Sequence, residues 1–300
     1  MKIVLALWAM AFSANVISAN WLNLYLFPSP STYNWNSPGS LTRSVVKNTI
    51  IPTKYLYRHA LGHVSVEVIC EKTSFSDSFY QLTGMTMAEN SEDSDLILKK
   101  KIGLGVMFYP MKGRLQTDEE VYTDMQDRLG SKKLNWLKFK INNLACMRIK
   151  RYLEIYQNEN LDRTYGLVFN PRKREGAGCS AFAISFLELA GLMRDEFKLR
   201  WSRRFFANHN LNGYNGGIDE ISILKLMFGK NSKKWGTDSR DGKEIFFWEP
   251  NLIYKWINET YKRESKYPTG IYSLERYGKS IGLMRDMTSK LIPIEPIFID

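Results

Sequence analysis

Between residues 57 and 110 the apolar positions recur at every second place, which is the period of a half-buried β-strand. In the stretch "HVSVEVIC" three valines alternate with serine, glutamate and isoleucine, and β-branched residues favour strands. The polar residues 73–78 predict a turn, and the acidic residues 88–95 predict a loop. We therefore expect three strands, which lie within residues 57–72, 79–87 and 96–110.

Beyond the third strand the apolar positions recur every three or four residues, as they do in amphipathic helices. Thr117 and the three acidic residues after it predict a capped helix start, and Gly130 predicts the end of that helix. A long helix is expected within residues 135–160. After a short extended piece, the apolar run over residues 178–192 predicts a further helix.

Strands followed by helices and a mixed tail predict the α+β class. The tail has helix-like stretches at residues 217–229 and 249–264, between turns rich in glycine and asparagine. Three hundred residues suit one elaborated domain, and no linker divides them. The expected organisation has four parts: residues 1–19 as a signal peptide, 20–54 as an irregular lead-in, 55–191 as the core, and 192–300 as a C-terminal extension packed on that core.

The N-terminus has the residue order of a secretory signal peptide. Lys2 precedes about ten apolar residues and then small ones, with cleavage expected after Ser18 or Ala19. The apolar run is shorter than the ~20 residues that span a bilayer, and no later stretch is long and apolar enough. The mature chain is therefore predicted to be periplasmic or extracellular, without a transmembrane span.

The chain is basic, with 42 Lys and Arg against 31 Asp and Glu and a formal net charge of +11. This charge favours anionic partners such as cell-wall polymer or anionic lipid. The basic runs are at most three residues long, so no specific nucleic-acid partner is expected. An apolar content of 44% supplies a packed core and argues against a disordered chain. The sequence leaves the oligomeric state open.

The three cysteines stand in different contexts. Cys70 lies in a strand-like run and Cys146 in a helix-like one, and the sequence leaves open whether they form a disulfide. Cys179 follows Gly-Ala-Gly at the start of an apolar helix. Unpaired N–H groups and the helix dipole stabilise a thiolate there, so Cys179 is the candidate nucleophile.

Of the three histidines, His63 has the context of a catalytic base, because it begins a strand directly after Gly62. An imidazole beside a cysteine can take the thiol proton and return one to the leaving group. His59 and His209 are expected to be surface or structural residues. The chain has no CxxC, HExxH, GxSxG or phosphate-loop motif, so neither a metal nor a cofactor is expected.

Two stretches, "GHVSVEV" around His63 and "GAGCSAFAISFLELAG" around Cys179, resemble the permuted papain-like superfamily. These are circularly permuted relatives of the NlpC-type cell-wall peptidases and include YiiX-like proteins and lecithin–retinol acyltransferase-type enzymes. The resemblance covers residues 55–190. It implies a small antiparallel sheet packed against the helix that bears the cysteine, with His63 as base and Cys179 as nucleophile.

The superfamily usually adds a polar residue on the next strand to orient the imidazole. We favour Gln81 over the threonines of the returning strand, because its amide oxygen can accept from an imidazole N–H. The backbone N–H of Cys179 is the natural donor to an oxyanion. The resemblance also implies that the Tyr165 hydroxyl adds to this site, with an ordinary core position as the alternative.

The leading hypothesis is an exported cysteine hydrolase, amidase or acyltransferase that forms an acyl-enzyme. Its substrate would be an amide or ester of the cell envelope, either peptidoglycan peptide or lipid. The alternative is a non-catalytic envelope- or glycan-binding protein on the same fold, in which tail tryptophans stack on sugars. A third reading is a cationic binder of nucleic acid or membrane surfaces. The tail tryptophans are Trp201, Trp235, Trp248 and Trp256.

Overall fold

The computed structural model describes residues 19–50, 60–72, 77–89, 93–213 and 220–300. The predicted signal peptide lies outside these residues apart from Ala19, and so does His59. Helices and three separate sheets alternate along the described chain, which confirms the α+β class.

A six-stranded sheet forms the body of the molecule, in the order β10-β11-β6-β1-β2-β3. Neighbouring strands are antiparallel except β11 and β6, which are parallel. The strands are β1 (Asn20–Phe27), β2 (His63–Cys70), β3 (Phe79–Thr83), β6 (Asn135–Ile141), β10 (Ser273–Tyr277) and β11 (Ser280–Asp286).

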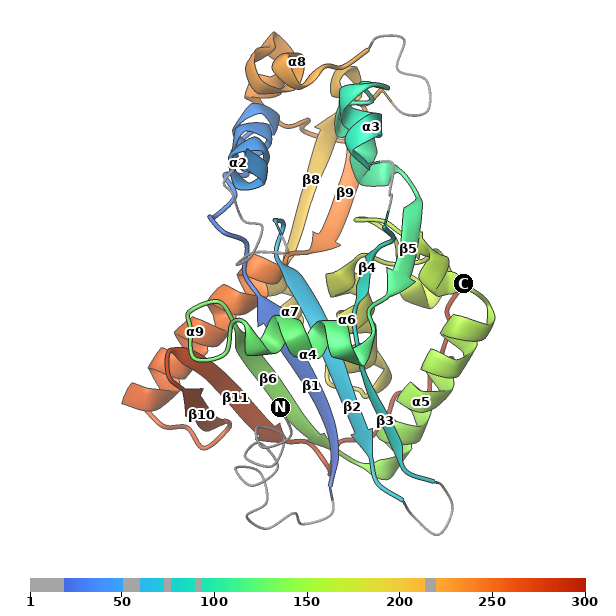
Figure 1. The fold of residues 1–300 in the computed structure, drawn as a ribbon, viewed down its shortest axis with the longest axis vertical. Helices are drawn as coiled ribbons and strands as arrows, with labels where there is room; N and C mark the ends of the chain where they lie inside the picture. The colour runs from blue at the N-terminus through green and yellow to red at the C-terminus, as the bar shows by residue number, and fades with distance from the viewer. Residues whose placement is uncertain (1–18, 51–59, 73–76, 90–92, 214–219) are drawn as a thin grey trace.

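Helices cover both faces of this sheet (Figure 1). On one face, alternate leucines of β1 and valines of β2 share a core with α5 (Asn143–Asn158), α6 (Cys179–Leu189) and α9 (Pro250–Lys266). On the other face, α4 (Asp118–Gln126) packs on Tyr25, Phe27 and other apolar residues. Because successive side chains of a strand point to opposite faces, the strands contribute to two cores, one on each side of the sheet.

Two smaller sheets complete the fold. The first has the order β4-β5-β7 and runs beside the main sheet; its strands are β4 (Met85–Met87), β5 (Met111–Leu115) and β7 (Thr164–Tyr165). The second is the ribbon of β8 (Ser202–Asn208) and β9 (Gly242–Trp248). It lies beyond one end of the main sheet with α2 (Pro38–Ile50), α3 (Asp93–Leu98) and α8 (Ile223–Phe228) (Figure 1).

The expected irregular lead-in at 20–54 is wrong, because it contains a central strand and a helix. β1 pairs with both β2 and β6, and its apolar residues alternate between two cores, so both faces of the strand are apolar. A strand buried on both faces lacks the polar alternation that identified β2.

Two further expectations are corrected. The third strand expected within 96–110 is α3 followed by the 3-10 helix Leu104–Phe108, and left-handed backbone at Lys101 and Gly103 interrupts the run. The long helix expected within 135–160 is β6 followed by α5. The prediction failed because apolar residues spaced four apart fit both the strand period and the helix period. The helix begins after Asn142, whose side chain accepts a hydrogen bond from the Ala145 N–H.

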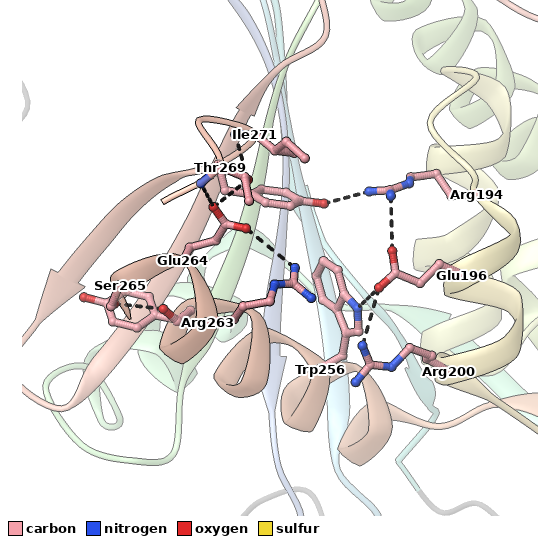
Figure 2. Close-up of polar contacts among 11 residues, drawn as sticks. Arg194, Glu196, Arg200, Trp256, Arg263, Glu264, Ser265, Thr269 and Ile271 are labelled. Carbon is pink, nitrogen blue, oxygen red and sulfur yellow. Dashed lines mark hydrogen bonds and ion pairs between the residues drawn. The ribbon is translucent and has the colours of Figure 1, made fainter. Parts of the chain in front are cut away.

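The prediction that residues 192–300 only pack on the core as an extension is also corrected, because they contribute a strand to the main sheet. β11 pairs with β6, so the main sheet is incomplete without the C-terminal segment. Helix α7 (Asp195–Trp201) joins α9 through Glu196, which accepts from the Trp256 indole N–H at 2.9 Å and pairs with two arginines (Figure 2). The boundary expected at residue 191 therefore falls within one continuous sheet and its helix layer.

A disulfide joins Cys70, the last residue of β2, to Cys146 on α5. It closes a loop with a sequence separation of 76 and ties the strand that begins at His63 to the helix layer. Cys179 is the free cysteine. None of the described helices combines the length and the apolar character that crossing a bilayer requires.

Candidate active site

Cys179 is the first residue of α6, as the sequence predicted. Gly178 is the N-cap, and the apolar residues that follow are buried in the main core, so the helix start is held firmly. The thiol is 7% exposed and receives hydrogen bonds from the Val64 backbone N–H and from the side chains of Ser180 and His63. Each of these donors stabilises the thiolate.

His63 is the first residue of β2, and its side chain is 3% exposed. β2 contacts α6 directly, and a hydrogen bond joins the His63 and Cys179 side chains. The structure therefore brings together the two residues that the sequence analysis singled out, although 116 positions separate them. Their catalytic roles remain a prediction.

His63 and Cys179 each shift the pKa of the other in the direction that favours the other's charged form. Burial raises the pKa of the Cys179 thiol, but the charge and hydrogen bond of His63 outweigh burial and lower it. Burial likewise lowers the pKa of His63, and the Cys179 thiolate together with Gln116 and Asp124 raises it above its ordinary value. Both directions favour a thiolate–imidazolium pair over the neutral pair.

The residue that orients the imidazole is Gln116, whose Oε1 lies 2.6 Å from His63 Nε2. With Nε2 engaged in this way, Nδ1 is the ring nitrogen left for the thiol. Ser65, two residues along β2 and on the same face, donates to the same oxygen at 3.3 Å. The amide oxygen accepts from the imidazole and leaves its proton in place, so it stabilises the imidazolium.

Gln116 lies at the junction between β5 and α4, and its backbone is bound by Thr83 and Gly84 at the junction between β3 and β4. Its N–H donates to the Gly84 carbonyl at 2.8 Å, and its own carbonyl accepts from the Thr83 hydroxyl at 2.7 Å. The next residue, Thr117, forms a capping box with Glu120. The predicted helix cap therefore directly follows the residue that is hydrogen-bonded to His63.

The expectation that Gln81 orients His63 is wrong, and the reason is register. Gln81 pairs with Val68, five residues along β2 from His63 and therefore about 16 Å away. The returning strand ends at Thr83, before it reaches the level of His63. A glutamine directly before the capped helix start was the available sequence signal, but the pairing of β4 with β5 that brings it to His63 was not readable.

Gly84 lies against this group and must lack a side chain. A Cβ there would lie 2.6 Å from Gln116 Oε1 and 3.0 Å from both His63 Nε2 and Ser65 Oγ. These separations are shorter than van der Waals contact, so any larger residue would push on the imidazole or its partner. Gly84 is thus a site-shaping residue that the sequence analysis did not identify.

Tyr165, at the end of β7, lies beside Cys179 as the resemblance implied. Its hydroxyl makes hydrogen bonds with both the side chain and the backbone N–H of Cys179. Burial first, and then the Cys179 charge, raise the pKa of Tyr165 well above its ordinary value, so it stays a neutral donor. The Tyr165 hydroxyl therefore lies next to the Cys179 N–H.

A buried ion pair lies near the imidazole. Asp124 on α4 and Arg128, two residues beyond the end of that helix, are joined at 3.1 Å and are almost fully buried. The Arg128 guanidinium lies 5.3 Å from the Phe27 ring centre, and that ring lies 6.1 Å from the ring of His63. The Asp124 carboxylate adds to the rise in the His63 pKa, and its pairing with Arg128 compensates its burial.

A pocket of about 360 Å³ is lined by Ala181 and Glu188 of α6, whereas Cys179, two residues before Ala181, lies on another face of that helix. Aromatic residues of β9 and apolar residues of the segment 167–171 form its apolar part, and its charged part is Glu188, Arg194, Asp195 and Lys198. Burial raises the pKa of Glu188, and the nearby Arg172 opposes that rise. The pocket is therefore lined by both apolar and ionic groups.

Two other expectations concern the tail and metals. Trp201 and Trp256 are fully buried and pack on Phe197, so they are core residues and not platforms for sugars. Trp235 and Trp248 are half-buried. His209 is exposed at a 3-10 helix, as expected. In the part of the chain that the structure describes, no group of three or more His, Cys, Asp and Glu side chains is arranged to hold a metal ion.

No family model, curated protein or solved structure matches this chain. The site is therefore defined by its own geometry: a thiol at a helix start, an imidazole at a strand start, an amide oxygen on the second ring nitrogen, and a phenol at the cysteine N–H.

Proposed function

We propose that the protein is a cysteine hydrolase, amidase or acyltransferase that works through an acyl-enzyme on Cys179. The observation that carries the proposal is the hydrogen-bonded series from Cys179 through His63 to Gln116. A thiol and an imidazole that shift each other's pKa values in opposite directions are typical of activated nucleophiles.

In the first half of the proposed reaction, the thiolate forms a bond to the carbonyl carbon of an amide or ester. The Cys179 N–H and the Tyr165 hydroxyl stabilise the negative oxygen. The His63 imidazolium gives its proton to the leaving amine or alcohol as the C–N or C–O bond breaks. In the second half, water or another acceptor loses a proton to His63 and attacks the thioester, and the thiolate leaves.

The order of the groups along the chain supports a permuted papain-like fold. The histidine strand precedes the cysteine helix, and that helix packs against the sheet that carries the histidine. The amide at the imidazole comes from outside the returning strand, which departs from the pattern that the resemblance implied.

We propose an envelope amide or ester as the substrate, either peptidoglycan peptide or lipid, because export is predicted and the net charge is +11.

The test is the pH dependence of iodoacetamide alkylation at Cys179, followed by peptide mass spectrometry between about pH 4 and about pH 9. We expect the wild-type thiol to react with a pKa well below the ordinary value of about 8.5, and His63→Ala to return it toward that value. A second readout is p-nitrophenyl acetate, which should leave one acetyl group on Cys179.

The matched control is His209→Ala, which removes an exposed imidazole and should leave the profile unchanged. Cys70 and Cys146 are protected as a disulfide, so alkylation reports Cys179. A wild-type thiol with an ordinary pKa, or one that is indifferent to His63→Ala, would overturn the proposal and favour the non-catalytic alternative.

A further inference from the structure

A basic and apolar surface lies at the end of the molecule farthest from β10 and β11. There α8 packs on α2, and both contact the 3-10 helix Lys230–Lys233 (Figure 1). We call this surface the α2–α8 tip. It is defined by six exposed residues: Arg43, Lys47, Leu224, Phe228, Lys230 and Lys233.

The segments that form the tip carry no acidic residue. Neither residues 27–50 nor residues 221–237 contain Asp or Glu, whereas together they contain six Lys and Arg. These two segments therefore contribute six positive charges and no negative one, although the basic residues look scattered along the sequence. A surface of one sign attracts a partner of the other sign, so the partner is anionic.

Two large apolar side chains project from the same surface. Leu224 is 69% exposed and Phe228 is 65% exposed, and their spacing of four places them on one face of α8. Exposed leucine and phenylalanine beside lysines are typical of helices that lie at a membrane interface. A soluble polyanion offers no apolar phase for such side chains, whereas a lipid bilayer does.

A hollow of about 190 Å³ adjoins these apolar residues. It is lined by Asn34, Ser40, Arg43, Ser44 and Lys47, all of which can donate hydrogen bonds. The Arg43 guanidinium connects the hollow to α8, because it donates to the Met227 carbonyl at 2.6 Å and lies 5.9 Å from the Phe228 ring centre. A phosphate group matches this donor set.

We propose that the α2–α8 tip docks on an anionic phospholipid bilayer. Leu224 and Phe228 enter the boundary between headgroups and acyl chains, and Arg43 and Lys47 bind a headgroup phosphate in the hollow. Lys230 and Lys233 add long-range attraction to the charged surface. This inference goes beyond the chemistry at Cys179 and does not depend on it.

The experiment is co-sedimentation of the full chain with vesicles of phosphatidylcholine alone or of equal parts phosphatidylcholine and phosphatidylglycerol. We expect binding only to the anionic vesicles, weakened by salt. Lys230→Gln with Lys233→Gln should weaken it roughly 25-fold, since each basic residue near the surface contributes about five-fold. Leu224→Ser with Phe228→Ser should weaken it at least about ten-fold.

The matched controls are Lys262→Gln with Lys279→Gln, and Leu199→Ser. They remove equally exposed side chains elsewhere, and Leu199 is 82% exposed. Circular dichroism checks that every variant is folded. Equal binding to both vesicle types would overturn the proposal, as would equal losses in tip and control variants. The proposal would also be overturned if the protein bound soluble polyphosphate as tightly as vesicles and if Leu224→Ser with Phe228→Ser left vesicle binding unchanged. Dimerisation through the tip without vesicle binding would overturn it as well.

Discussion

At the Cys179 site, polar side chains are buried and bound to one another, whereas the charged side chains of the α2–α8 tip extend into solvent. The surroundings of each group decide what its charge can do. In the buried site a neighbouring charge changes a pKa, because little water screens it. At the tip water screens each charge, so the cations act together and at longer range.

The comparison also explains why the two regions tolerate change differently. At the site, a Cβ added to Gly84 would lie within 3.0 Å of atoms of Gln116, His63 and Ser65, so a single methyl group would displace these side chains. The tip residues are exposed, and their replacement should alter binding with little effect on folding. Variants of one region should therefore leave the readout of the other unchanged.

The largest expected effect on the site comes from Gly84→Ala. The new methyl group would displace Gln116 Oε1, the flexible end of a side chain, and crowd His63 Nε2. Loss of a hydrogen bond to a charged group should raise the Cys179 pKa by about one unit or more, measured by alkylation against pH. Vesicle binding should not change.

A double variant shows whether Gly84→Ala acts through Gln116. In a Gln116→Ala background the added methyl group has room, so Gly84→Ala should have little further effect on the Cys179 pKa. Two independent, additive shifts would show instead that the methyl group acts on His63 alone.

Gln116→Leu should have the next largest effect, because it removes the partner of Nε2 without adding bulk at Gly84. We expect the His63 pKa to fall by about one unit, as read from imidazole NMR signals. Gln116→Glu provides the opposite change, since a carboxylate should raise the His63 pKa further. Equal His63 pKa values in the two variants would contradict the positioning role.

Glu120→Gln should have the smallest effect on the site. The Arg114 hydrogen bond is the largest of the causes that lower the pKa of Glu120 to about 2, and Glu120 also completes the capping box at Thr117. A glutamine can keep the capping box, so the charged pair with Arg114 is what Glu120→Gln removes; we expect a loss of about 1 kcal/mol in the free energy of unfolding and a Cys179 pKa close to that of wild type.

The pH dependence of this loss has a definite sign. Because the folded pKa is lowered, the stabilisation by Glu120 is fully present above the ordinary value of about 4.3 and disappears as the pH falls toward 2. Melting curves of wild type and Glu120→Gln should therefore converge at acid pH. A constant difference across that range would assign the stabilisation to another cause.

Local patterns in the sequence determined the elements that carry the chemistry. The valine alternation placed the histidine strand, Thr117 and its acidic neighbours placed the start of α4, and Gly178 placed Cys179 at the first turn of α6. Each of these signals depends on residues within one or two turns or strand periods, so no distant part of the chain was needed.

The tertiary structure alone decided which distant groups meet. The register of β3 places Gln81 beside Val68, and the pairing of β4 with β5 places Gln116 at His63. Strand pairing depends on how sheets close in space, which a short-range pattern does not encode. The same holds for the Cys70–Cys146 disulfide and for β1, whose two apolar faces acquire meaning only when both helix layers are in place.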